Sequence, residues 1–109
     1  MTMKASQFKT ELKSISTDLR GMTLKLMTKY SSIPYKSLKT FGNAILEQEK
    51  YGNSFNVTGV YTANGIVSVN SFEMVMELIK SGVATGVLFR AFYQPADRYE
   101  SMQLAGSLD

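Results

Sequence analysis

The stretch FNVTGVYTANGIVSV, residues 55–69, decides the fold of this chain. Two runs rich in β-branched and aromatic residues, 55–61 and 66–69, flank the dipeptide Asn64-Gly65. Asn-Gly is the strongest short signal of a β-hairpin, because both residues tolerate the positive φ angles of a tight turn. The sequence therefore predicts a hairpin that turns at Asn64-Gly65, with Gly59 marking a bulge or a close approach inside its first strand.

The segment after the hairpin predicts a helix and a third strand. Asn70 and Glu73 form a capping box, and mostly apolar residues follow as far as Lys80. Gly82 marks the end of this helix, which we expect to be largely buried. Residues 84–93 are apolar on both alternating faces, so we expect a strand in the centre of the sheet.

Helical periodicity dominates the chain before the hairpin. Apolar residues at spacings of three and four form one seam: Ala5, Phe8, Leu12, Ile15, Leu19, Met22 and Leu26. Such a seam predicts a long helix with a weak point at Gly21. Pro34 suits the first turn of a second helix, which is capped by Ser32 and runs to about Lys50.

These expected elements define the fold class and the domain. Their order is α-α-β-β-α-β, and we predict an α+β fold with a small antiparallel sheet. A chain of 109 residues with 44% hydrophobic residues fits one domain. We divide this single domain, 1–109, into a basic helical half at 1–50, a hairpin, helix and strand half at 51–97, and a tail at 98–109.

His and Cys are both absent from the sequence. The chain therefore has no thiolate nucleophile, no zinc–thiolate site and no imidazole base. Glu73 and Glu77 lie one helical turn apart, but no further acid lies nearby in the sequence to complete a metal site. We therefore expect them on the solvent-exposed side of a helix. No nucleophile elbow or phosphate loop occurs. We expect a non-enzymatic protein with no metal, no cofactor and no small-molecule substrate.

Positive charge is concentrated at the N-terminal end of the chain. Residues 1–39 carry eight cations and two carboxylates, whereas residues 40–109 carry four cations and seven carboxylates. Lys and Arg at near-helical spacing can contact successive phosphates. The candidate nucleic-acid contacts are Lys9, Lys13, Arg20, Lys25, Lys29, Lys36 and Lys39. The alternative is a solvated face that only keeps the protein in solution.

Two tyrosines lie next to these cations. Tyr30 follows Lys29, and Tyr35 precedes Lys36. Aromatic rings between lysines can stack on unpaired bases. They also occur at the rim of a core with their hydroxyls in water, and the sequence leaves both interpretations open.

The chain contains more apolar residues than the core of a protein of this size easily buries. Met is common at adaptable binding surfaces. We expect some of these residues to meet another chain, either a second copy in a symmetric homodimer or a target protein. The candidate interface residues are Leu24, Met27, Met74, Leu78 and Phe92. The alternative is a compact monomer in which the first two helices cover one face of the sheet and the third covers the other.

These surfaces lead to two functional hypotheses. The first is a small binding module that acts through protein–protein contact, such as a phage or mobile-element accessory factor that inhibits a host protein. The alternative is a nucleic-acid-binding protein that uses the basic N-terminal helices largely without sequence specificity. No stretch approaches the roughly 20 apolar residues of a membrane span, and the N-terminus does not read as a secretory signal. We therefore expect no membrane partner and a cytoplasmic location.

Overall fold

The structure, a computed structural model, describes residues 2–93 of the chain. Three helices and five strands follow one another in these residues: α1 (Ala5–Ser14), β1 (Thr23–Met27), β2 (Ser32–Tyr35), α2 (Leu38–Lys50), β3 (Asn53–Thr62), β4 (Gly65–Ser68), α3 (Phe72–Lys80) and β5 (Gly86–Tyr93). The predicted α+β class is confirmed, as is the order of hairpin, helix and final strand. The predicted tail, 98–109, lies outside the described residues.

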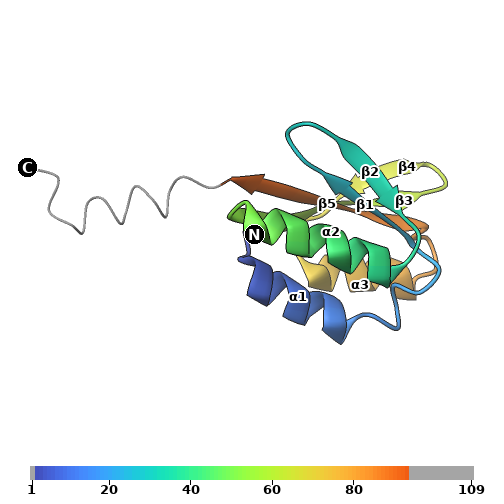
Figure 1. Ribbon diagram of the computed structural model, residues 1–109. Helices are drawn as coiled ribbons and strands as arrows, with labels where there is room; N and C mark the ends of the chain where they lie inside the picture. The colour runs from blue at the N-terminus through green and yellow to red at the C-terminus, as the bar shows by residue number, and fades with distance from the viewer. Residues whose placement is uncertain (1, 94–109) are drawn as a thin grey trace, which may run out of the picture.

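The strands form one sheet in the order β2-β1-β5-β3-β4 (Figure 1). β1 runs parallel to β5, and the other neighbouring pairs are antiparallel. The sheet is therefore mixed and larger than the antiparallel sheet expected from the sequence. As predicted, β5 lies in the centre, and its pairing with β1 and β3 joins the halves 1–50 and 51–97 in one sheet.

The hairpin predicted at Asn64-Gly65 is formed by β3 and β4. Thr62 pairs with Gly65, whose φ of +123° lies in a region that favours glycine. The Thr62 hydroxyl accepts a hydrogen bond from the Asn64 amide at 3.2 Å and donates one to the Gly65 carbonyl at 3.0 Å. Gly59 follows a β-bulge, and a Cβ at this residue would come within 2.8 Å of Ile66 Cδ1, so both predicted roles of Gly59 are confirmed.

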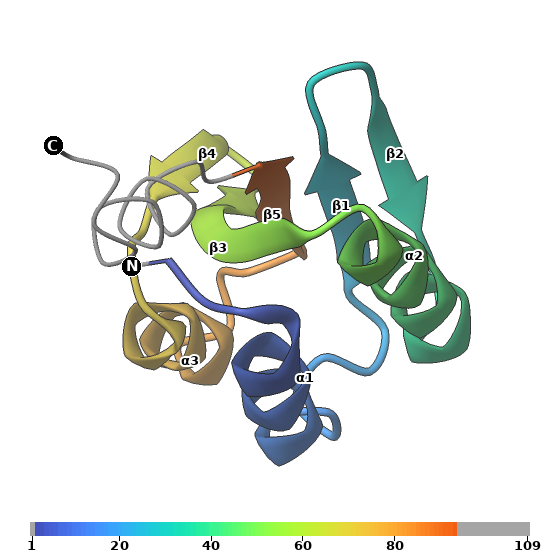
Figure 2. The ribbon, with the colours of Figure 1, turned by 60° about the vertical axis from the view of Figure 1, so that its left-hand side comes forward.

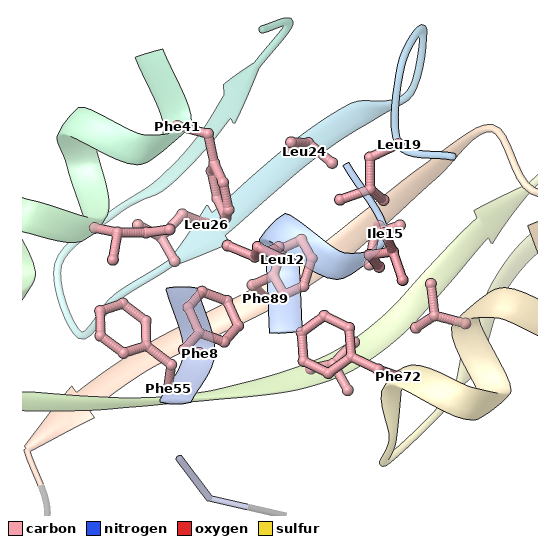
Figure 3. Packing of buried hydrophobic residues seen from close by; sticks show 14 of the residues in the cluster. Phe8, Leu12, Ile15, Leu19, Leu24, Leu26, Phe41, Phe55, Phe72 and Phe89 are labelled. Carbon is pink, nitrogen blue, oxygen red and sulfur yellow. The ribbon is translucent and has the colours of Figure 1, made fainter. Parts of the chain in front are cut away.

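All three helices pack on the same face of the sheet (Figure 2). Phe8 of α1 lies at the centre of the buried layer (Figure 3): its ring stacks on Phe55 of β3, with centroids 4.7 Å apart, and meets Phe89 of β5 edge-on at 5.3 Å. Phe41 of α2 and Phe72 of α3 lie 5.1 Å and 6.1 Å from the same Phe89 ring. The arrangement with a helix layer on each face is therefore wrong.

The long N-terminal helix expected as far as Leu26 is also wrong. α1 ends at Ser14, and Gly21, with a φ of +83°, leads the chain into β1. The seam residues as far as Leu19 are buried as predicted, but beyond Gly21 the burial alternates, with Leu24 and Leu26 buried and their neighbours half-buried. A period of two is the pattern of a strand, so the end of the seam belongs to the sheet.

The start of the second helix differs from the prediction. Ser32 and Pro34 lie in β2, an edge strand, where a proline that lacks an N–H is tolerated. α2 instead begins after Ser37, whose hydroxyl accepts a backbone hydrogen bond at 3.2 Å from the first turn. Ser71, rather than Asn70, caps α3 in the same way.

Gly42 offers a test of helix energetics in α2. A Cβ at this residue would meet nothing within 4 Å. We expect Gly42→Ala to raise the free energy of unfolding by about 0.5–1 kcal/mol, because glycine lowers helix stability through its conformational freedom. Gly52→Ala is the control: it has the same open space, but its φ of +75° disfavours alanine, and it should destabilise the protein. Urea unfolding of both variants measures the difference, and a loss of stability in Gly42→Ala would contradict the prediction.

Candidate functional site

The face of the sheet opposite the helices is uncovered by any element within residues 2–93, and we call it the open face. The cross-strand register shows which side chains share it: Lys25 of β1 lies between Pro34 of β2 and Leu88 of β5. Arg90 of β5 lies opposite Asn56 of β3 in the same way. Alternation along each strand then gives the set. The open face carries Thr23, Lys25, Met27, Ser32, Pro34, Ser54, Asn56, Gly59, Tyr61, Ile66, Ser68, Gly86, Leu88, Arg90 and Phe92.

The carboxylates of residues 2–93 lie outside the strands, whereas cations occur in both the helices and the strands. The strands contain no Asp or Glu, and they contribute two cations to the open face, Lys25 and Arg90. Lys29 adds a third cation in the turn between β1 and β2. The described carboxylate residues lie on the helices or in the segment that leads from α1 to β1: Glu11, Asp18, Glu47, Glu49, Glu73 and Glu77. The open face is therefore positive, and no carboxylate of the strands neutralises it.

Two cations of the open face lie over aromatic rings. Lys25 Nζ is 5.8 Å from the centroid of the Tyr61 ring, and the Arg90 guanidinium carbon is 5.1 Å from the centroid of Phe92. Such pairs are attractive through the ring quadrupole. Each pair presents a positive group next to an apolar surface, so a partner with an anionic group beside an apolar one fits either pair.

Clefts lie at both ends of β5. At its first residue, a cleft of about 420 Å³ is lined by Lys25, Pro34, Tyr61 and Gly86, among others. At its last residues there are two clefts of about 490 and 510 Å³, and both are lined by Lys29. On the open face, the clefts of about 420 and 510 Å³ thus lie at the two ends of β5, and each has a cation in its lining.

The seven cations predicted to contact nucleic acid do not form one stripe. Lys9 of α1 pairs with Glu49 of α2, with Nζ and Oε1 3.0 Å apart. Lys13 also lies on α1, while Arg20 precedes β1 and Lys36 and Lys39 flank the start of α2. Only Lys25 and Lys29 belong to the strands and turns on the side of the open face. The sequence prediction missed Arg90, which completes the positive face.

The five predicted interface residues are also separated by the fold. Leu24 is 1% exposed and belongs to the core, so its place in an interface is wrong. Met74 and Leu78 lie on α3, in the helical layer, while Met27 and Phe92 lie on the open face. The prediction also missed Ile66 and Tyr61, which lie beside each other across β3 and β4. Only Met27 and Phe92 therefore coincide with the candidate site.

Glu73 and Glu77 lie on α3, as predicted. Within residues 2–93, no group of three or more His, Cys, Asp or Glu side chains is placed to hold a metal ion. None of the helices in this part of the chain is long and apolar enough to cross a membrane. Comparison with known proteins gives no match: no family model, no curated protein and no solved structure matches the chain. A function is therefore inferred from the surfaces alone.

Proposed function

We propose that this chain is a non-enzymatic binding module that acts in the cytoplasm through contact with another protein, and that the open face is its contact surface. The observation that carries the proposal is a sheet with helices on one face and a positive, partly apolar surface on the other. Antiparallel sheets that face water usually present polar residues there. Here Met27, Ile66 and Phe92 lie on the water side as well as polar residues, and Ile66 is 53% exposed.

The charge of the open face indicates the chemistry of the partner. Lys25 and Arg90 meet no carboxylate from the strands around them. An acidic surface with apolar residues at its centre complements such a face, because opposite potentials speed the encounter and fix the orientation of the complex. If the chain is a small phage or mobile-element accessory factor, one partner of this kind is an acidic host protein that it inhibits.

Charge reversal on the open face tests the proposal. In the double variant Lys25→Glu, Ile66→Glu, a partner that wild-type protein captures from source-cell extract should bind on the order of 100-fold more weakly, because like charges across an interface cost several kcal/mol. The capture is carried out with and without nuclease, and a partner that is retained with nuclease is a protein. Affinities of the captured partner are then measured by titration against the purified variants.

A matched control separates the open face from total charge. Lys13→Glu, Val83→Glu makes the same two kinds of substitution at exposed residues outside the strands, and this variant should bind like wild type. Circular dichroism confirms that both variants fold. Equal loss of the partner in both double variants would show that net charge, and not the open face, governs binding. Light scattering on the wild type tests the homodimer version, in which the partner is a second copy.

The cation–aromatic pairs favour a second candidate, single-stranded nucleic acid. Aromatic rings with adjacent cations stack on unpaired bases and hold the phosphates beside them. Binding of an oligothymidylate should then fall steeply with salt. It should also be lost in Lys25→Glu, Ile66→Glu and kept in the control. Partner capture that nuclease abolishes would favour this candidate over a protein partner.

A further inference from the structure

A gap in the sheet lies beside the last three residues of β5, Ala91–Tyr93. These residues pair with β3 on one side. On the other side, pairing with β1 ends at Met27 and Arg90. Figure 1 shows the turn between β1 and β2 projecting away from the tip of β5. We call the space between this turn, residues 28–31, and Ala91–Tyr93 the notch.

The turn is closed by its own hydrogen bonds and does not reach back to β5. The Thr28 amide donates to the Ser31 carbonyl at 2.7 Å. The Thr28 hydroxyl accepts from the Tyr30 and Ser31 amides at 3.2 and 3.1 Å. These bonds close the turn on β2, and within residues 2–93 no strand continues the pairing of β1 along this edge of β5.

Backbone groups of β5 point into the notch. Met3 exchanges two backbone hydrogen bonds with Phe55, at 2.7 and 2.8 Å, on the side of β3 away from β5. The backbone groups of Phe55 thus point away from its partner Ala91, which makes this a non-hydrogen-bonded pair. By the alternation of an antiparallel ladder, the backbone groups of Ala91 and Tyr93 point away from β3. The Ala91 carbonyl and the Tyr93 amide then face the notch, as the acceptor and donor of an edge that no strand within residues 2–93 fills.

The notch has a cleft on each face of the sheet. On the helical face, a cleft of about 490 Å³ is lined by Tyr30, Gln48 and Tyr51 as well as by the notch. On the open face, a cleft of about 510 Å³ is lined by Met27 and Arg90. An extended chain places successive side chains on opposite faces. A strand in the notch would therefore place one side chain in each cleft.

The lining of the notch selects an acidic segment. Lys29 lines both clefts and Arg90 lines one, and among residues 2–93 no Asp or Glu lines either. Tyr30, at 87% exposed, and Tyr93, at 52%, add apolar surface that such a segment would cover. We infer that the notch is a strand-addition site for an extended, acidic peptide segment of a partner protein. The inference rests on the proposed protein-binding function and names the part of the partner that is recognised.

The backbone edge distinguishes a peptide from a nucleic acid. Amide groups of an added strand can bond to both the Ala91 carbonyl and the Tyr93 amide. Tyr93→Pro removes this amide hydrogen but should leave the pairing with β3, because Tyr93 lies in a non-hydrogen-bonded pair with Asn53. Tyr93→Ala is the matched control, since it removes the ring and keeps the amide.

The test uses the full chain and a labelled peptide of alternating aspartate and valine, with a lysine–valine peptide and an oligothymidylate as comparison probes. We expect the fluorescence anisotropy of the aspartate–valine peptide to rise on binding to wild type. We expect its affinity to fall about tenfold or more in Tyr93→Pro, as the loss of one hydrogen bond predicts, and only a few-fold in Tyr93→Ala. Lys29→Glu should reverse the preference between the two peptides.

Four results would overturn the inference. Two concern the aspartate–valine peptide itself: it does not bind, or it binds wild type and Tyr93→Pro with equal affinity. The third is that the lysine–valine peptide binds equally well. The fourth is tight binding of oligothymidylate that the aspartate–valine peptide does not displace. If Tyr93→Pro does not fold, unchanged affinity in Lys29→Glu overturns it. A partner lost in Lys25→Glu, Ile66→Glu but retained in Tyr93→Pro leaves the proposed function standing and removes the strand-addition site.

Discussion

Replacing Phe8 with Ala should lower the free energy of unfolding by about 3–5 kcal/mol, the range for a buried aromatic residue truncated to alanine. Phe8 is 0% exposed and touches a ring from each major part of the buried layer. It contacts Phe41, Phe55, Phe72 and Phe89. The truncation would leave a cavity that these rigid rings cannot close. Urea unfolding monitored by circular dichroism measures the loss.

Phe92→Ala is the matched control for this loss. It removes the same side chain from the open face, where Phe92 is only half-buried. We expect a clearly smaller change, because less apolar area returns to water and no enclosed cavity forms. Similar losses in the two variants would mean that the open face is covered in solution, and concentration-dependent unfolding would then identify a second copy as the cover.

The hairpin could be predicted from the sequence because its signal is local. Asn64-Gly65 fixes the turn, and alternating residues on either side fix the strands. The centre of the sheet could also be predicted, because β5 carries apolar residues on both faces, Val87 and Phe89 on one and Leu88 and Phe92 on the other. Neither inference needs knowledge of residues far away in the chain.

The N-terminal strands could not be predicted by the same means. The spacing of three and four residues continues past the end of α1 at Ser14 as far as Leu26, and the true period of two spans only the five residues of β1. What stabilises β1 is its parallel pairing with β5, a contact between distant segments that no local pattern shows. Pro34 was also assigned wrongly from local sequence, because proline suits both the first turn of a helix and an edge strand.

The candidate site was predicted only in part for the same physical reason. Lys25 and Phe92 were singled out for different functions, and only the sheet brings them to one face. Arg90 was missed because a single cation in an apolar strand reads as a solvated position. One signal was present in the sequence: residues 51–71 contain no charged residue at all, so the strands lack any acid to balance Lys25 and Arg90.

Gly86→Ala should destabilise the protein by about 1–3 kcal/mol, the usual cost of overpacking. A Cβ at Gly86 would lie 2.7 Å from the carbonyl oxygen of Thr23, so the backbone of β1 or β5 must move. This contact lies at the start of the parallel pairing between the two strands. We therefore expect faster hydrogen exchange at the amides of β1 as well as a lower urea midpoint.

Whether a second substitution can restore the lost stability depends on which atom the added Cβ meets, a backbone atom or a side-chain atom. Thr23→Ala should not rescue Gly86→Ala, because the carbonyl oxygen remains in place. Gly59→Ala gives the contrasting case: its Cβ would lie 2.8 Å from Ile66 Cδ1, the end of a side chain. Ile66→Ala should therefore recover part of the stability that Gly59→Ala loses, while the Val67 carbonyl oxygen, 3.2 Å from the added Cβ, stays in place. A double-mutant cycle measures this coupling. Rescue of Gly86→Ala by Thr23→Ala would show that side-chain crowding, and not the approach of two backbones, requires glycine where β1 joins β5.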